Sequence, residues 1–421
     1  MKLTKPERSW VLYDVANSAF TMLISTTIPI YFRSLVENSG ADPATATGIW
    51  GIVTSVAIAI LAILSPILGA IADYKGMKKK MFLLFLAIGL LGGISLSVTT
   101  DWVAYMIVFV LARIGYTACN VFYDSMITDV TDDNRIDYIS SAGFAWGYIG
   151  SCVPFIAGIA VIFIKPFGIS TGMATQISFL IAVVWWGLMT IPLLRNVKQT
   201  YFLENRRDKI LHSFTRLGAT LKKIIKEKTI FFFILAYFFY IDGVYTIISM
   251  ATTYGGEVGI DSNSMILALL LTQFVAFPFA ILAGKLASKF GALKLIKVYI
   301  LWYIAICLFG YQLDQQWEFW VLAVAVGLAQ GGVQSLSRSY FGKLIPKEES
   351  NEYFGFFDIF GKFADFFGPL LLAASAFIFK TSTYGILALV LLFIIGLIFL
   401  SFIPKEKAAA TASPSDSNNI N

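Results

Sequence analysis

The stretch Gly69-Ala-Ile-Ala-Asp73-Tyr-Lys-Gly76-Met-Lys78-Lys79-Lys80 lies between two long apolar runs, at residues 47–71 and 81–99. A run of about 20 apolar residues is long enough to cross a bilayer as a helix. The connection is very short, so its glycines permit a tight backbone. Its lysines are expected to hold the turn in water, and Asp73 can interact favourably with a nearby helix N-terminus. The stretch therefore indicates two antiparallel spanning helices joined by a charged turn.

Further apolar runs extend this pattern along the chain. Hydrophobic residues make up 57% of the 421 residues and charged residues only 14%, against about 25% charged in soluble domains. Helices fit these runs because a spanning segment must satisfy its own backbone hydrogen bonds. We predict an all-α integral membrane protein with twelve spans, at residues 10–32, 47–71, 81–99, 102–123, 139–164, 176–194, 229–251, 263–287, 293–311, 317–337, 354–379 and 384–403.

The loops carry a strong charge asymmetry. One alternate set of loops, together with both termini, holds 27 of the 32 lysines and arginines, whereas the opposite set holds only Arg33, Lys165 and Lys380. Because positively charged loops stay in the cytoplasm, both termini are predicted to be cytoplasmic, in a multi-pass protein of the cell membrane. The positive charge then reflects orientation and does not indicate nucleic-acid binding.

The longest loop divides the chain into two sets of six spans. We predict an N-terminal bundle at 1–194, a cytoplasmic linker at 195–228, a C-terminal bundle at 229–403 and a disordered tail at 404–421. In the linker, apolar residues recur at helical spacing among basic ones, which predicts an amphipathic helix on the anionic inner leaflet. Its apolar positions are Ile210, Phe214, Leu217, Leu221, Ile224 and Ile225.

The two halves repeat. Gly69 to Gly76 follows the second span, and Gly284-Lys-Leu-Ala-Ser288-Lys-Phe-Gly291 follows the eighth, 215 residues later; the same offset relates Pro154 to Pro369. Such internal repeats are typical of transporters built from two related bundles. We predict pseudo-twofold symmetry along the membrane normal around a central cavity.

The first copy resembles the signature that follows helix 2 in the major facilitator superfamily. The matching residues are Gly69, Asp73, Gly76, Lys78 and Lys79. The resemblance implies that Asp73 latches the two bundles across the cytoplasmic gate. Ser288 replaces the acid in the second copy, so the two latches are not expected to be equivalent.

Other segments resemble one branch of that superfamily, the vacuolar amino-acid effluxer family and its bacterial relatives. They are Tyr13-Asp14-x-x-Asn17-Ser18, Asp242-Gly243, Gly331-Gly332-x-Gln334-x-x-x-Arg338-Ser339, Phe354-Gly355-Phe356, Gly361-Lys362 and Gly368-Pro369. The resemblance covers most of the chain and implies alternating-access transport, with an amino acid as the best-guess solute.

Ionisable side chains inside spans are costly and usually functional. Asp14 and Asn17 share a face of the first helix, beside Tyr13. They form either a substrate or proton site or a polar cluster that bonds neighbouring helices. Asp242, near the middle of the seventh span, either binds protons or a substrate amine, or forms a buried ion pair.

A second group of charges lies on the eleventh and fourth spans. Asp358, Lys362 and Asp365 fall on one stripe, as a salt-bridge network or a coupling site. Arg113 is a partner for this stripe or a carboxylate ligand, since its guanidinium binds planar anions with two hydrogen bonds. Asn120 shares the Arg113 face, and Asp124 is expected at the gate.

Three glutamines complete the candidates for substrate or proton coupling. Gln273, Gln330 and Gln334 suit hydrogen bonding to a small polar solute or between helices. Arg338 lies at the end of the tenth span. There it is expected either to pair with an acidic group at the gate or to anchor the helix end at the membrane surface.

The chain has no GxxxxGK[ST], GxSxG or HExxH motif and no clustered metal ligands, so no enzymatic chemistry, cofactor or metal is indicated. We expect a monomeric secondary transporter in the lipid bilayer, which moves a small-molecule solute with protons or another cation. A sugar or glycoside symporter is the alternative, with Tyr13, Trp146 and Tyr148 as stacking partners. A non-transporting sensor or scaffold is the alternative from another class.

Overall fold

The computed structural model describes residues 2–25, 27–40, 43–206, 209–379 and 381–404. Within these ranges the secondary structure is helical, apart from one isolated bridge between Tyr74 and Leu203. Twelve segments are long and apolar enough to cross a membrane, which confirms the predicted number. Residues 405–421, most of the predicted disordered tail, lie outside the described residues.

The first six spans use eight helices. They are α1 (Lys5–Ser25) with α2 (Thr27–Asn38), α3 (Pro43–Ala72), α4 (Met77–Leu96), α5 (Trp102–Ser125) with α6 (Ile127–Val130), α7 (Ile136–Ile164) and α8 (Thr171–Asn196). The second six are α10 (Lys228–Glu257), α11 (Ser262–Phe290), α12 (Ala292–Gly310), α13 (Gln316–Leu344), α14 (Ser350–Phe379) and α15 (Thr383–Ser401). Short 3₁₀ turns at Pro166–Gly168 and Lys347–Glu349 precede α8 and α14.

Several helices extend beyond the apolar runs that predicted them. The Asp101 carboxylate accepts from the backbone N–H of Ala104 and caps α5, and Asp261 caps α11 in the same way through Ser264. Side-chain caps satisfy backbone groups that a helix end leaves without partners. α13 runs to Leu344, seven residues past the predicted end at 337, and so carries Arg338 as part of a regular helix.

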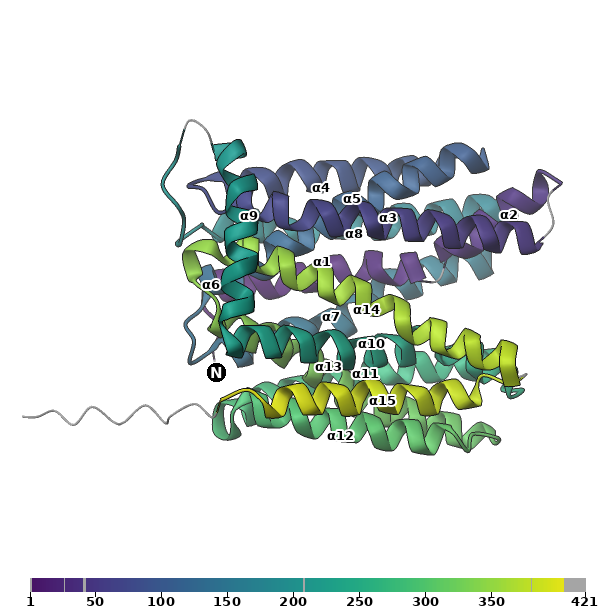
Figure 1. The fold of residues 1–421 in the computed structure, drawn as a ribbon. Helices are drawn as coiled ribbons and strands as arrows, with labels where there is room; N and C mark the ends of the chain where they lie inside the picture. Colours follow the sequence, from purple (N-terminus) through teal and green to yellow (C-terminus); the bar gives the residue numbers. More distant parts are fainter. Residues whose placement is uncertain (1, 26, 41–42, 207–208, 380, 405–421) are drawn as a thin grey trace, which may run out of the picture.

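The helices form two bundles that lie side by side (Figure 1). α3 packs against α14 and α7 packs against α11, and these two pairs form much of the boundary between the bundles. The N-terminus, the turn after α3 and the start of α14 all lie at one end of the molecule, with the helix α9 (Lys209–Lys226) across it. We call this the linker end; the charge asymmetry predicts that it is cytoplasmic.

The repeated glycines occupy equivalent places in these two pairs. A Cβ atom on Gly69 of α3 would lie 2.2 Å from the carbonyl oxygen of Asn351 at the start of α14. A Cβ atom on Gly284 of α11 would lie 2.7 Å from the side chain of Ser141 near the start of α7. Each glycine thus permits backbone contact between the bundles at the linker end.

α9 lies where the sequence predicts an amphipathic helix in the linker, but its apolar residues are not all buried. Ile224 is buried against the bundles, whereas Phe214, Leu221 and Ile225 are exposed. The buried face of α9 also carries polar side chains. Arg216 on that face contacts carboxylates of both bundles. Contact of the exposed residues with lipid stays a prediction.

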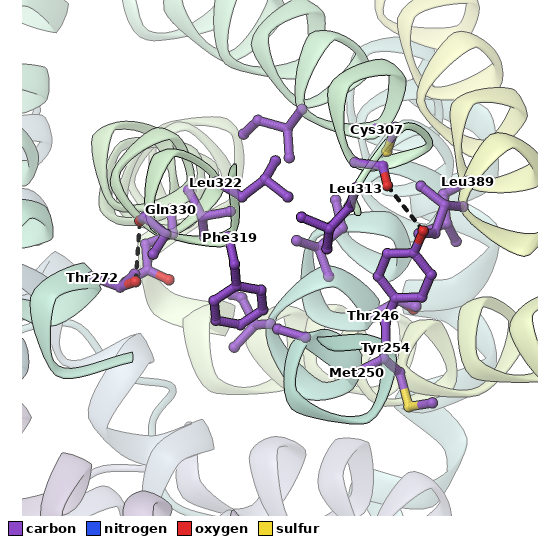
Figure 2. Close-up of a pocket in the computed structure, with 18 of the residues that line it drawn as sticks. Thr246, Met250, Tyr254, Thr272, Cys307, Leu313, Phe319, Leu322, Gln330 and Leu389 are labelled. Carbon is purple, nitrogen blue, oxygen red and sulfur yellow. Dashed lines mark hydrogen bonds between the residues drawn. The ribbon is translucent and has the colours of Figure 1, made fainter. Parts of the chain in front are cut away.

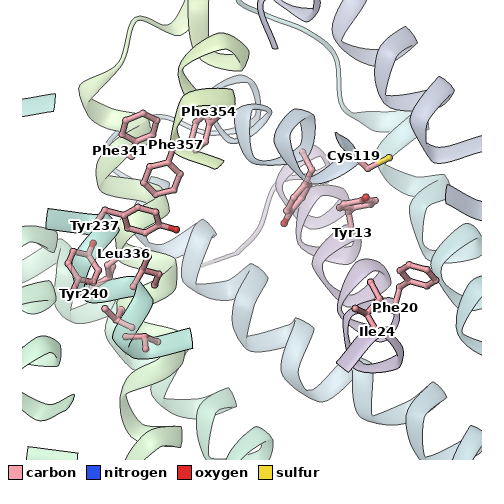
Figure 3. Close-up of a cluster of buried hydrophobic side chains, with 14 of the residues drawn as sticks. Tyr13, Phe20, Ile24, Cys119, Tyr237, Tyr240, Leu336, Phe341, Phe354 and Phe357 are labelled. Carbon is pink, nitrogen blue, oxygen red and sulfur yellow. The ribbon is translucent and has the colours of Figure 1, made fainter. Parts of the chain in front are cut away.

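Each bundle has its own aromatic core (Figure 3). In the first, the ring of Tyr13 packs against Phe82 and Tyr123, with centroids 5.2 and 4.6 Å apart. In the second, Phe357 stacks on Tyr237 at 4.0 Å and on Phe341 at 4.5 Å. Aromatic pairs of this kind stabilise a core beyond their buried area.

Gly69→Ala is expected to force the bundles apart at the linker end. Overpacking costs about 1–3 kcal/mol, which corresponds to a roughly 5- to 150-fold shift in a two-state equilibrium. The measurement is the spin-label distance between cysteines placed at the exposed positions Lys80 and Lys289, in a background without native cysteines. Gly187→Ala, whose Cβ would lie 3.6 Å from Leu90 in ordinary contact, is the control. An unchanged distance distribution in Gly69→Ala would contradict this account of the contact.

Candidate functional site

The turn between α3 and α4 receives the start of α14. Gly76 adopts a left-handed backbone with φ of 73°, which suits glycine. The buried Asp73 carboxylate accepts hydrogen bonds from the backbone N–H and the side-chain amide of Asn351, both at 2.9 Å, and from the backbone N–H of Glu352 at 3.3 Å. The first N–H groups of a helix have no partner within it. Asp73 therefore supplies acceptors across the boundary between the bundles.

The linker helix α9 adds a cation to this turn. The guanidinium of Arg216 lies 3.3 Å from Asp73 and also contacts the carboxylate of Glu352, whose side chain is buried. Burial raises the pKa of Asp73 to about 6, against the opposing effects of Asn351, Arg216 and Lys78. α9 thus joins acidic groups of both bundles through one arginine.

Gate residues on α4 support the same turn. Lys78 is buried, lies 2.5 Å from Asp129 and donates to the Ser350 hydroxyl at 3.3 Å, while Lys79 follows it in the first turn of α4. Asp129 also accepts from the backbone N–H groups of Thr200 and Tyr201. The predicted gate residues Gly69, Asp73 and Lys78 therefore meet the start of α14 directly, whereas the backbone N–H of Gly76 donates to Gln199 of the linker.

Arg338 of α13 is the second charge that crosses the boundary. It is 5% exposed, and its guanidinium lies 3.0 Å from Asp14 of α1 and 2.9 Å from Asp124 of α5. It also donates to the hydroxyl and the carbonyl of Ser140 on α7. The rings of Trp10, Tyr123 and Phe144 surround it, with centroids 4.6, 5.5 and 4.4 Å from the guanidinium carbon. The N-terminal bundle thus forms a complete enclosure for one cation of the C-terminal bundle.

Lysines of the C-terminal bundle extend this contact along α7. Asp137, at the start of α7, lies 2.6 Å from the ammonium of Lys343 and accepts from the Ser339 hydroxyl at 2.7 Å. Lys347 lies 3.1 Å from Asp133. The acidic residues before and at the start of α7 therefore contact basic residues of the other bundle. The charge asymmetry of the loops had given these acidic residues no function.

Other candidates lie farther into the spans. The Asn17 amide donates to Asn120 at 3.1 Å between α1 and α5. On α14, Asp358 contacts Lys362 and accepts from the Ser65 hydroxyl of α3 at 2.7 Å. Arg113 of α5 interacts electrostatically with Lys362 across the boundary. The side chain of Asp365 lies outside the described residues.

Asp242 joins α10 to α14 within the C-terminal bundle. Its buried carboxylate accepts from the backbone N–H of Gly368 at 2.9 Å and from the Thr246 hydroxyl at 3.4 Å. A Cβ atom on Gly368 would lie 1.7 Å from that hydroxyl, so glycine is required beside Pro369. These two partners are neutral groups of the same bundle.

The remaining candidates divide between a cavity and the core. Gln273 and Gln330 line a cavity of about 110 Å³ inside the C-terminal bundle (Figure 2), whereas Gln334 is half-buried one turn farther along α13. Tyr13 lies in the core of the N-terminal bundle, away from the boundary (Figure 3). Within the described ranges, no three His, Cys, Asp or Glu side chains are placed to hold a metal.

Sequence reasoning missed several residues that meet at the linker end, namely Ser140, Arg216, Asp137, Lys343 and Glu352. Asp137 and Glu352 are 215 residues apart, which is the offset of the repeat, and both begin helices. This third pair in register was the available signal. Arg216 carried no such signal, because its partners come from segments distant in sequence.

The comparisons identify the family of this arrangement. A family model described as "Vacuole effluxer Atg22 like" matches residues 4–134 and 128–413. The chain belongs to the Atg22-like vacuole effluxer family. It is 44% identical over 411 residues, 96% of both chains, to an uncharacterised MFS-type transporter, YxiO, of Bacillus subtilis (strain 168).

More distant family members and solved structures agree with the fold. Autophagy-related protein 22-1 of Penicillium rubens is 29% identical over 62% of this chain, which spans 47% of that protein. The human organic anion transporter MFSD10 and the transporter FucP in its outward conformation each match with a TM-score of 0.70, over 95% of this chain and 99% and 98% of theirs, at 14% and 15% identity. This Atg22-like chain is therefore a major facilitator-type membrane transporter and not an enzyme.

Arg338→Gln is expected to open the linker end. Removing one partner of a buried ion pair costs about 3–5 kcal/mol, because the remaining charges are left uncompensated. The Lys80–Lys289 label distance should lengthen, and Lys343→Gln, at a partly exposed pair, should lengthen it less. Adding Asp14→Asn to Arg338→Gln should restore part of the short distance. Equal effects of the two single changes would contradict a special role for Arg338.

Asp73 predicts how the closed linker end responds to pH. An exposed aspartate has a pKa of about 3.9, whereas Asp73 in the closed contact has a pKa of about 6. The closed form therefore binds more protons between these values and is favoured as pH falls from 7 to 5. The same label distance, measured against pH, should shorten over that window. Asp73→Asn should weaken this dependence, and an unchanged response in that variant would assign it to another group.

Proposed function

We propose that this transporter moves a small zwitterionic solute, with an amino acid as the best guess, across the cytoplasmic membrane by alternating access. The observation that carries the proposal is a set of charges at mid-span: Arg113 of one bundle interacts electrostatically with Lys362 of the other, and Lys362 pairs with Asp358. A guanidinium binds a carboxylate with two hydrogen bonds, and a carboxylate suits an ammonium group.

The closed linker end supports alternating access. Arg338 and Asp73 join the bundles there, while Arg113 and Lys362 lie deeper in the spans. Opening this end separates buried charges, which must then be hydrated. Interfaces of this kind are bistable and do not deform continuously, so the two bundles exchange between discrete arrangements.

We further propose that a proton drives this exchange through Asp14. Arg338 is held by two carboxylates, Asp14 and Asp124. A proton on Asp14 removes one negative charge from the enclosure, weakens the attraction to Arg338 and lowers the cost of opening. Asp242, the other candidate, holds the backbone of α14 beside Pro369, so its protonation acts on the shape of that helix.

The geometry gives less support to a sugar or glycoside solute. Of its proposed stacking partners, Tyr13 belongs to the core of one bundle. Trp146 packs against Phe277 with centroids 5.2 Å apart and is 46% exposed. A sugar would also make no ionic contact with the mid-span charges of Arg113, Asp358 and Lys362.

The test is uptake of radiolabelled amino acids and sugars by proteoliposomes that contain the full chain, under an imposed pH gradient. Amino-acid transport that follows the gradient is expected. Arg113→Gln should raise KM about 10- to 100-fold, because a hydrogen bond to a charged group contributes about 1.5–3 kcal/mol. Arg33→Gln, at an exposed pair with Glu37, is the matched control and should transport normally.

Two further variants test the coupling. Asp14→Asn should transport without responding to the pH gradient, and Asp242→Asn should transport slowly but keep the response. If Asp14→Asn responds to the gradient like the wild type, the proposed coupling role of Asp14 is wrong. Gradient-dependent uptake of sugars, with none of amino acids, would replace the zwitterion proposal with the sugar one.

A further inference from the structure

The cavity inside the C-terminal bundle is separate from the mid-span charges. It is lined by residues of α10, α11, α12, α13, α14 and α15, and none of these lining residues is charged. Aliphatic side chains, Phe319 and Cys307 form most of its wall. Figure 2 shows Thr272 and Gln330 on one side of the open space and Tyr254 with Cys307 on the other.

Most polar groups on this wall already have partners. The Thr272 hydroxyl donates to the carbonyl of Ala268 and approaches that of Ala323 at 3.1 Å. The Tyr254 hydroxyl donates to the carbonyl of Gly310 at 3.1 Å. Thr246 donates to Asp242. These bonds leave the wall apolar in character despite its hydroxyl groups.

Gln330 differs from these hydroxyl groups. Its side chain is 3% exposed, and its amide nitrogen Nε2 has no hydrogen-bond partner among the described residues. Leaving a buried donor unpaired costs about 1–3 kcal/mol. Buried polar groups nearly always have a partner, and the position of Gln330 on the cavity wall makes this donor available to an acceptor inside the cavity.

The size and polarity of the cavity define what fits. Protein interiors contain few voids larger than a water molecule, and an engineered apolar cavity of about 150 Å³ binds benzene. A cavity of about 110 Å³ is in this range and is too small for a lipid chain. A charged or zwitterionic molecule would meet no counter-charge on its lining.

We propose that this cavity binds a small, uncharged and mainly apolar molecule that presents one acceptor, such as a ketone oxygen, to the Gln330 amide. Its apolar body fills the space between Phe319 and Cys307. The ligand is chemically distinct from the zwitterion proposed above, and the site does not depend on the identity of that solute. Thr246 connects the wall to Asp242 and Gly368, so occupancy is expected to affect the packing of α10 on α14.

The experiment is photolabelling of the full chain in lipid nanodiscs with a cyclohexanone that carries an alkyl diazirine, followed by peptide mass spectrometry. Labels are expected on cavity-lining peptides, around residues 246–254 and 319–330. Unlabelled cyclohexanone should compete about five- to tenfold better than methylcyclohexane at equal concentration in the bilayer, because only the ketone accepts from Gln330. Equal competition by both, or labels confined to the lipid-facing surface, would overturn the proposal.

Variants separate ligand binding from a water molecule that satisfies Gln330. Gln330→Leu should lose the preference for the ketone, whereas Gln312→Leu, at an exposed position, should keep it. Leu322→Trp should fill the cavity and abolish labelling, and it remains informative if Gln330→Leu fails to fold. Labelling that survives in Leu322→Trp would show that the probe binds elsewhere. Amino-acid transport, measured in parallel, tests the proposed function independently of these results.

Discussion

The enclosure of Arg338 is the contact on which the closed arrangement of this transporter depends. Moving a guanidinium out of water costs several kcal/mol even after relaxation. Asp14, Asp124 and Ser140 offset that cost only while the two bundles touch, since the arginine belongs to one bundle and its partners to the other. Any movement that separates them exposes three charges at once. The linker end is therefore either closed with Arg338 paired or open with these three charges hydrated.

The internal repeat explains why closure takes this form. Gly69 and Gly284 occupy equivalent helices, and each lets the start of a helix in the other bundle approach its backbone. Glu352 and Asp137, which begin those opposing helices, are also equivalent in the repeat. The features that the repeat conserves between the two halves are thus the small residues and the helix starts. These features determine the distance between the bundles. The charges that hold them together are arranged differently on the two sides.

That difference has a physical consequence for the linker. Asp73 accepts from the start of α14, whereas its counterpart Ser288 donates to the carbonyl of Gly284 in its own helix. Burying the carboxylates of Asp73 and Glu352 on one side requires a cation, and α9 supplies it as Arg216. On the other side Asp137 has Lys343 from the adjacent bundle and needs no linker residue. The position of α9 over one side of the boundary follows from this uneven charge.

The sequence predicts the spans and the repeat well because hydropathy and glycine spacing are local properties. It also identifies Asp14, Asp73 and Arg338 as candidates, since each is a charged residue inside or at the end of an apolar span. It does not predict that Asp14 and Arg338 meet, because 324 residues separate them and only packing determines which helices face each other. Gln330 shows a second case in which packing, and not the residue type, determines the environment of a side chain. Its residue type suggests a polar solute, yet the surrounding side chains make its cavity apolar. A ligand of this cavity must therefore match the apolar wall as well as the amide.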